Sequence, residues 1–294
     1  MSAPLVEQAP AKINLTLRVL GRRADGYHEL ESLVAFADFA DTLGLQPDEA
    51  TALDISGPFA GPSGPVSDNL VLKAVAALRQ QLPGLTAGRF RLEKNIPVAA
   101  GIGGGSADAA AALRLLARAN RIALDDSRLS AAALRVGADV PVCLDPRPRI
   151  MRGIGDRLSA ALDLPLLPAV LVNPGLPLAT RDVFAKFAGV QANTEIAEVP
   201  RQPDALIEFL GAHGNDLTPG AIACLPVIAD VLMALRALPG VRLARMSGSG
   251  PTCFALFASP GEASAAAQRL KAERTDWWVH CTTIGTVALS AIWG

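Results

Sequence analysis

The stretch Pro97–Ala107 reads PVAAGIGGGSA, and the run DAAAALRLLARAN follows it as residues Asp108–Asn120. The run contains strong helix formers and no breaker, so it predicts a helix that starts just after the glycines. Bare backbone N–H groups next to a helix N-terminus form a site for phosphate. A tight turn that binds nothing is the alternative, but four glycines within five positions favour the phosphate site.

The same stretch excludes two common nucleotide-binding folds. No Lys-Ser or Lys-Thr pair follows the glycines, so the loop is not a Walker A motif. Position 106 is serine where a dinucleotide fingerprint requires glycine, which argues against a Rossmann dehydrogenase. Ser106 is instead predicted to be the N-cap of the helix.

Composition bounds the remaining classes. The chain has 294 residues, of which half are hydrophobic, and this length suggests two domains at roughly 150 residues each. Lys and Arg total 27 against 28 Asp and Glu, so no basic excess points to nucleic acid or to an anionic membrane. The four cysteines form no CxxC pair, and no signal peptide or apolar span is recognisable. We expect a cytoplasmic protein with reduced thiols that binds neither membrane nor nucleic acid.

Alternating residues predict a strand over Ile13–Val19, with Lys12 and Asn14 on one face. Asp25-Gly26 indicates a hairpin turn after it. Gly137–Pro141 is predicted as a turn before a short strand. Further strands and helices are expected along the chain, with Asp68 capping the first of these helices: strands 33–45, 90–93, 169–172, 241–246 and 253–258, and helices 70–82, 127–136, 204–210, 226–238 and 260–273.

Three polar residues are ambiguous when taken alone. Lys12 fits a solvated strand lysine as well as a site lysine. Asp139, in the segment GADVP, fits a carboxylate that satisfies turn N–H groups. Tyr27 is the sole tyrosine and lies beside His28 in a polar turn, where it is either a stacking residue or a rim residue.

Taken together, the motifs resemble those of the GHMP kinases. Their phosphate loop has the form P-x-x-x-G-x-G-x-S-[SA], and the corresponding stretch here, Pro97–Ala107, reads PVAAGIGGGSA. Ala244–Phe257, ARMSGSGPTCFALF, resembles their C-terminal glycine loop. The likeness covers nearly the whole chain. Its most discriminating segments are PAKINLTLRVLGRRADGYHELES (10–32), SDNLVLKA (67–74), GADVPVCL (137–144), VNPG (172–175) and GNDL (214–217).

The resemblance implies an α+β fold of two domains: an ATP-binding domain over residues 1–155 and a ferredoxin-like substrate domain over residues 156–294. The active site is then expected in the cleft between them. The resemblance also implies ATP and Mg²⁺ as cofactors. The implied acceptor is a small molecule, cytidine diphosphate methylerythritol, whose 2-hydroxyl receives the phosphoryl group.

The resemblance also implies roles for individual residues. Asp139 acts on the substrate hydroxyl, either as a base or as an orienting group, and Lys12 assists it. The glycine loop holds the phosphates, and two residues outside it, Asn69 and Lys94, lie near the adenosine. The expected loop residues are Pro97, Val98, Ala99, Ala100, Gly101, Ile102, Gly103, Gly104, Gly105, Ser106 and Ala107.

The acceptor is expected to contact Asn14, Tyr27, His28, Thr180 and Phe184, with cytosine stacked between Tyr27 and Phe184. Phe187 lies close enough in sequence to take the place of Phe184. The metal ligands are undetermined by sequence. Ser106 is one candidate, although an N-cap role explains the same serine.

Two other functions remain open at this point. One is another GHMP kinase with a homoserine or mevalonate-type acceptor, which the segment GYHELES argues against. The other is a nucleotide-binding module without chemistry, which the presence of both Lys12 and Asp139 argues against. A monomer or a homodimer is expected.

Overall fold

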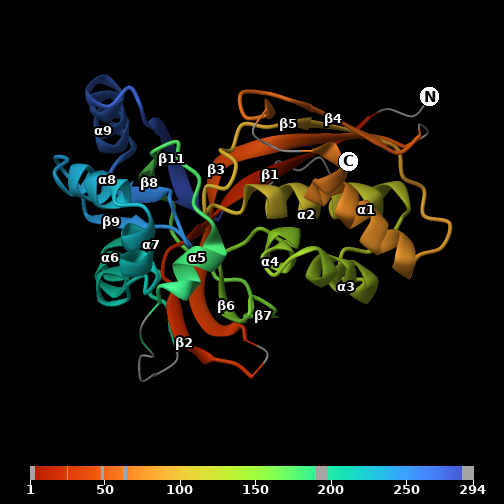
Figure 1. The fold of residues 1–294 in the computed structure, drawn as a ribbon, viewed down its shortest axis with the longest axis horizontal. Helices are drawn as coiled ribbons and strands as arrows, with labels where there is room; N and C mark the ends of the chain where they lie inside the picture. The colour runs from red at the N-terminus through yellow and green to blue at the C-terminus, as the bar shows by residue number, and fades with distance from the viewer. Residues whose placement is uncertain are drawn as a thin grey trace.

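The computed structural model describes residues 4–24, 26–47, 50–61, 65–187, 189, 196 and 198–286. Its strands form one sheet whose main path runs β4-β5-β3-β11-β8-β10-β9. Figure 1 shows helices α1–α4 packed against one half of this sheet and helices α5–α9 gathered around the other half. The strands are β1 Leu5–Asn14, β2 Arg18–Arg22, β3 His28–Gln46, β4 Ala52–Ser56, β5 Arg89–Glu93, β6 Arg149–Gly153, β7 Arg157–Leu158, β8 Leu167–Asn173, β9 Leu243–Met246, β10 Cys253–Leu256 and β11 Trp278–Gly285.

The helices alternate with these strands in an α+β order. They are the short 3-10 helix Val66–Asp68 and the α-helices α1 Leu70–Gln81, α2 Gly104–Ala119, α3 Ser127–Val136, α4 Val140–Leu144, α5 Thr180–Ala185, α6 Pro203–Ala212, α7 Thr218–Cys224, α8 Val227–Arg236 and α9 Pro260–Glu273. Among the helices of the described ranges, none has the length and apolar character needed to cross a bilayer.

Strand β3 is the spine that joins the two halves. It pairs with β1, β2, β5 and β6, and near its centre Phe36 and Ala37 pair with the end of β11. Strands β8–β11 lie in the order β11-β8-β10-β9, antiparallel throughout, with helices connecting β8 to β9 and β10 to β11. This is the βαββαβ arrangement of a ferredoxin-like unit, so the predicted fold class is confirmed. The predicted domain boundary at 155/156 falls in the turn between β6 and β7 and stays a prediction.

Helix α2 is the buried centre of the first half. Its residues from Ala107 to Ala117 are buried, and the many alanines allow close packing against β1 and its neighbouring helices. Arg114 is 1% exposed and donates to the Glu7 carboxylate, to the Gln8 carbonyl and to the Cys143 carbonyl. Because these three acceptors lie on β1 and α4, the hydrogen bonds of the buried guanidinium hold α2 against both elements.

The structure corrects two of the predicted elements. The strand expected over Ile13–Val19 is broken: β1 ends at Asn14 and β2 starts at Arg18. In the gap the Thr16 hydroxyl accepts from the Leu33 N–H, so the alternating pattern continues through a register change. The segment expected to form a strand after GADVP is helix α4, whose first turn accommodates Pro141.

Two helix caps also differ from the predictions. Helix α1 is capped by the Asn69 side chain, which accepts from the Val71 N–H, and Asp68 lies in the preceding 3-10 turn. Helix α2 begins at Gly104 with Gly103 as its N-cap residue, so Ser106 lies inside the first turn. The predicted N-cap role of Ser106 is therefore wrong. Ser106 instead lines the cleft described below.

Candidate functional site

A cleft of about 1420 Å³ runs between the two halves of the molecule. It is lined by the first glycine loop, the start of α4, the β2–β3 hairpin, α5 and the second glycine loop. Most of the predicted site residues line it: Lys12, Asn14, Tyr27, His28, Asn69, Lys94, Pro97, Val98, Ala99, Ala100, Gly101, Gly103, Gly104, Gly105, Ser106, Asp139, Thr180 and Phe184. Ile102 and Ala107 do not, because both side chains are buried in the core.

The first glycine loop follows β5 and ends in α2. Ala99, Gly101 and Gly103 have φ angles of 52°, 74° and 64°, a region that glycine adopts without strain. Since Gly103 is the N-cap residue, the N–H groups of the first turn of α2 have no partner within the helix. These groups and the positive end of the helix dipole face the cleft, as an anion site requires.

The second glycine loop, Ser247–Pro251, holds the first one in place. The Ser247 hydroxyl donates to the Gly101 carbonyl at 3.2 Å, and the Thr252 N–H donates to the Ala100 carbonyl at 3.1 Å. A Cβ atom built on Gly101 would lie 2.3 Å from the Gly250 carbonyl oxygen. The two loops therefore pack backbone to backbone, at a contact that only glycine permits.

Lys12 and Asp139 form an ion pair between the two loops and the start of α4. The Lys12 Nζ lies 3.0 Å from Asp139 Oδ2 and 3.1 Å from Asn14 Oδ1. Lys12 is buried, whereas 39% of the Asp139 side chain is exposed. The lysine is therefore fixed in place while the carboxylate can still reach a ligand in the cleft. This geometry removes the interpretation of Lys12 as a solvated surface lysine.

Lys94 lies beneath the first glycine loop and is bound by two carboxylates. Its Nζ donates to Asp108 Oδ2 at 2.7 Å and also to Asp41. Burial lowers the pKa of Lys94, but the charges of Asp108 and Asp41 outweigh it and raise that pKa overall. The second oxygen of Asp41 accepts from the backbone N–H groups of Asn95 and Ile96, so this cluster anchors the entry to the loop. The predicted contact of Lys94 with adenosine stays a prediction.

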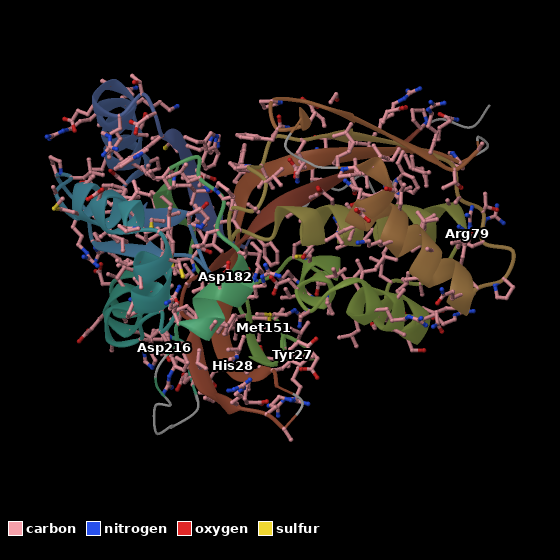
Figure 2. All side chains as sticks on the ribbon, viewed as in Figure 1. Tyr27, His28, Arg79, Met151, Asp182 and Asp216 are labelled. Carbon is pink, nitrogen blue, oxygen red and sulfur yellow. The ribbon has the colours of Figure 1, made fainter. Side chains whose placement is uncertain are left out.

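An aromatic cluster of His28, Phe184 and Phe187 also lines the cleft. The rings of His28 and Phe184 stack with centroids 4.9 Å apart and planes at 24°, and Phe187 meets His28 edge-on at 6.2 Å. Figure 2 shows Tyr27 and His28 on the β2–β3 hairpin, next to α5. The side chain of Tyr27 is 62% exposed. Burial and the nearby Arg22 lower the pKa of His28, which favours the neutral ring with one donor and one acceptor nitrogen.

The sequence analysis did not identify several residues in the cleft or supporting its walls. The Ser249 hydroxyl bonds to that of Thr180 at 2.9 Å. Asn215, from the segment GNDL, donates to the carbonyls of Met246 and Gly248 and so shapes the second loop. Asp216 accepts from the Val19 N–H and ties this segment to β2. The motif was visible in the sequence, but no spacing rule assigns such supporting contacts.

The comparisons with known proteins agree with this architecture. The models named "GHMP kinases N terminal domain" and "GHMP kinases C terminal" match residues 69–145 and 195–275. A curated protein of Rhodopseudomonas palustris (strain BisB5), named 4-diphosphocytidyl-2-C-methyl-D-erythritol kinase, is 56% identical over 288 residues, or 94% of this chain and 97% of its own. This chain is a member of the GHMP kinase family.

Other relatives extend this result. A protein of the same name from Methylobacterium radiotolerans is 56% identical, over 95% of this chain and 98% of its own. A crystal structure of 4-(cytidine 5'-diphospho)-2C-methyl-D-erythritol kinase superposes with a TM-score of 0.79 at 35% identity, covering 96% of this chain and 100% of that chain. A homoserine kinase from Cytophaga hutchinsonii, at 20% identity and a TM-score of 0.70 over 97% of this chain and 96% of that chain, shares the fold.

The glycines of the first loop in this GHMP kinase differ in which atoms an added side chain would contact. A Cβ atom built on Gly104 would lie 2.9 Å from Ile96 Cγ2 and 3.1 Å from Lys94 Nζ. Both atoms belong to buried side chains, which must shift to admit the methyl group, so we expect Gly104→Ala to cost about 1–2 kcal/mol of unfolding free energy. Gly101→Ala meets a backbone carbonyl at positive φ, so we expect about 3 kcal/mol or more.

Urea unfolding of the two variants measures this difference. Each is the other's matched control, because both add one methyl group to the same loop. Equal losses of stability in the two variants would contradict the proposed backbone contact between the loops.

Proposed function

We propose that this chain transfers the γ-phosphoryl group of ATP to the 2-hydroxyl of 4-diphosphocytidyl-2-C-methyl-D-erythritol, a step of non-mevalonate isoprenoid precursor synthesis. The observation that carries the proposal is that one cleft brings three groups together. The phosphate-type glycine loop, the Lys12–Asp139 pair and the aromatic cluster all line this cleft. Relatives of 51–56% identity that carry this enzyme's name support the choice of acceptor.

In the proposed reaction the acceptor hydroxyl attacks the γ-phosphorus, the bond from that phosphorus to the β-phosphate oxygen breaks, and ADP leaves. Asp139 accepts a hydrogen bond from the hydroxyl and takes its proton as the new bond forms. Lys12 keeps that carboxylate in position and offsets negative charge on the transferring group. The loop N–H groups hold the donor phosphates in line.

We propose Mg²⁺ as the metal that accompanies ATP. Ser106 and Asp108 lie on the first turns of α2 and line the cleft, and the buried Asp108 Oδ1 has no hydrogen-bond partner among the described residues. Mg²⁺ is commonly held by one or two such oxygen ligands together with substrate phosphates. When bound, it neutralises phosphate charge. The described residues contain no cluster of three or more His, Cys, Asp or Glu side chains, which agrees with a site completed by substrate.

An acceptor panel tests the proposed function. Purified protein is incubated with ATP and Mg²⁺ and with 4-diphosphocytidyl-2-C-methyl-D-erythritol, homoserine or mevalonate, and ADP release is coupled to NADH oxidation. We expect turnover with the cytidine acceptor alone. Turnover with homoserine or mevalonate instead would assign the protein to another branch of the family, and ADP release with none of the three would leave it without the proposed activity.

The aromatic cluster supports a specific prediction about base binding. We propose that cytosine stacks between Tyr27 and Phe184 and that His28 reads its polar edge. Since stacking of one base on an aromatic ring is worth roughly 1–3 kcal/mol, Tyr27→Ala should raise KM for the acceptor by about 5- to 150-fold. KM for ATP should stay nearly unchanged in a two-substrate kinetic analysis.

A matched control exists outside the cleft. Phe209 stacks on His213 at 4.0 Å, so Phe209→Ala removes a similar pair without touching the site. We expect Phe184→Ala, but not Phe209→Ala, to raise KM for the acceptor, and Phe187→Ala to have a smaller effect because its contact with His28 is edge-on. A rise in KM for ATP with Tyr27→Ala would place the hairpin on the donor side.

A further inference from the structure

Arg22 lies on the same face of the β2–β3 hairpin as His28. The two residues are directly opposite each other in the antiparallel register, and such cross-strand pairs project their side chains to one side of a sheet. Both residues line the cleft. The register therefore places a guanidinium next to the imidazole that stacks on Phe184.

Arg181 flanks the same stack from the opposite wall. It precedes Phe184 by three residues in α5, and residues at this spacing share one side of a helix. Arg181 also lines the cleft. Its side chain is 90% exposed, and its pair with Asp182 is a contact of 3.3 Å between adjacent exposed residues, which contributes little. Each ring of the His28–Phe184 stack thus has an arginine beside it on its own element, Arg22 on the hairpin and Arg181 on α5.

The other cations of the cleft are already paired. Lys12 is bound to Asp139, and Lys94 is bound to Asp108 and Asp41. Across the part of the chain that the structure describes, no carboxylate lies within ion-pair distance of Arg22. Because the chain carries a net charge of −1, its overall field does not attract an anion, and local cations must do so.

We propose that Arg22 and Arg181 form a diphosphate subsite, which holds the diphosphate of a nucleoside diphosphate acceptor beside its stacked base. The inference rests on the proposed function. In a nucleoside diphosphate one ribose carries both the base and the 5' diphosphate, so a base held at the aromatic cluster brings the diphosphate within reach of the neighbouring arginines. The guanidinium group is suited to this ligand because it binds phosphate oxygens in a bidentate manner. The alternative source of the same chemistry is the triphosphate of ATP.

The experiment compares binding of CDP and cytidine by calorimetry, with a non-hydrolysable ATP analogue at saturation to fill the donor site. Neither ligand contains the reacting hydroxyl, so the readout is independent of catalysis. We expect Arg22→Gln to weaken CDP about 5- to 20-fold and to leave cytidine unchanged, on the scale of one charge-assisted hydrogen-bonding group near the surface. Arg181→Gln should weaken CDP less, and Arg22→Lys should retain part of the preference for CDP. In the wild type, 0.5 M salt should reduce that preference.

Arg23→Gln is the matched control. Arg23 is the next residue of the hairpin, pairs with Glu29 and does not line the cleft. The pKa of His28, measured by NMR, independently checks that Arg22 lies close to the His28 ring. Arg22 contributes to the lowering of the His28 pKa. That pKa should therefore rise in Arg22→Gln and stay unchanged in Arg23→Gln.

Two results would overturn the subsite while leaving the proposed function intact. One is an unchanged ratio of CDP to cytidine affinity in a folded Arg22→Gln variant. The other is weaker binding of the ATP analogue with CDP unaffected, which would assign the arginines to the donor. Failure of the proposed function gives a different result, because the wild type would then bind neither cytidine nor CDP. That result would overturn both the proposed function and the diphosphate subsite.

Discussion

Replacing Asp139 by asparagine should lower kcat by about 10²- to 10⁴-fold, the scale expected when a general base is lost. The amide is nearly isosteric, so it keeps the shape of the α4 start, but it can neither take the hydroxyl proton nor balance the charge of Lys12 at 3.0 Å. We expect thermal stability to change little, because 39% of the Asp139 side chain is exposed. ATP affinity should also change little, because the donor phosphates are held by the N–H groups of the glycine loop and not by Asp139. Steady-state kinetics and calorimetry with the ATP analogue measure these quantities.

Asp126→Asn is the control for this substitution. Asp126 is also the residue at the start of a helix, α3, but it does not line the cleft. Its variant should retain full kcat. Near-normal turnover of a folded Asp139→Asn variant would remove Asp139 from the mechanism.

Lys12→Met should lower kcat by about 10²- to 10³-fold, comparable to the loss of one preorganised group that stabilises transition-state charge. Methionine fills the buried position of the aliphatic stem but leaves Asp139 without its ion-pair partner. Lys73→Met, at an exposed position of α1, is the control and should be silent. The measurement is kcat of the purified variants under saturating ATP and acceptor.

The double variant Lys12→Met/Asp139→Asn tests whether the pair acts as a unit. Residues that act together are strongly non-additive, so the double variant should lose about as much kcat as the worse single variant. Losses that multiply would mean that the two side chains act independently, which contradicts a mechanism based on their contact.

The sequence predicted elements best where local signals were complete. Helices α3 and α9 have the predicted bounds, because Asp126 and Ser259 cap runs of helix formers. The segment after GADVP was predicted wrongly, since a short apolar run of Val and Cys fits a strand as well as a buried helix. The break between β1 and β2 was missed because the Thr16–Leu33 contact, which depends on tertiary structure, sets it.

The site was only partly accessible from sequence. Period-two alternation alone placed Lys12 and Asn14 on one face, and their contact at 3.1 Å confirms it. The approach of Asp139 to Lys12 follows from no spacing rule, since the two lie far apart in the chain, and it was expected only from the family resemblance. The direction of the Gly104 Cβ toward Ile96 and Lys94 depends on the packed backbone, so the glycine pattern did not reveal it.

The most direct test of the account follows the product itself. Purified protein, ATP, Mg²⁺ and 4-diphosphocytidyl-2-C-methyl-D-erythritol are observed together by ³¹P NMR. We expect a phosphomonoester signal that grows in step with ADP while the acceptor's diphosphate signals remain. Carbon–phosphorus coupling in the ¹³C spectrum of the product should place the new phosphate on the 2-hydroxyl. A phosphate on another hydroxyl, or ADP formed together with inorganic phosphate and unchanged acceptor, would contradict the proposed function.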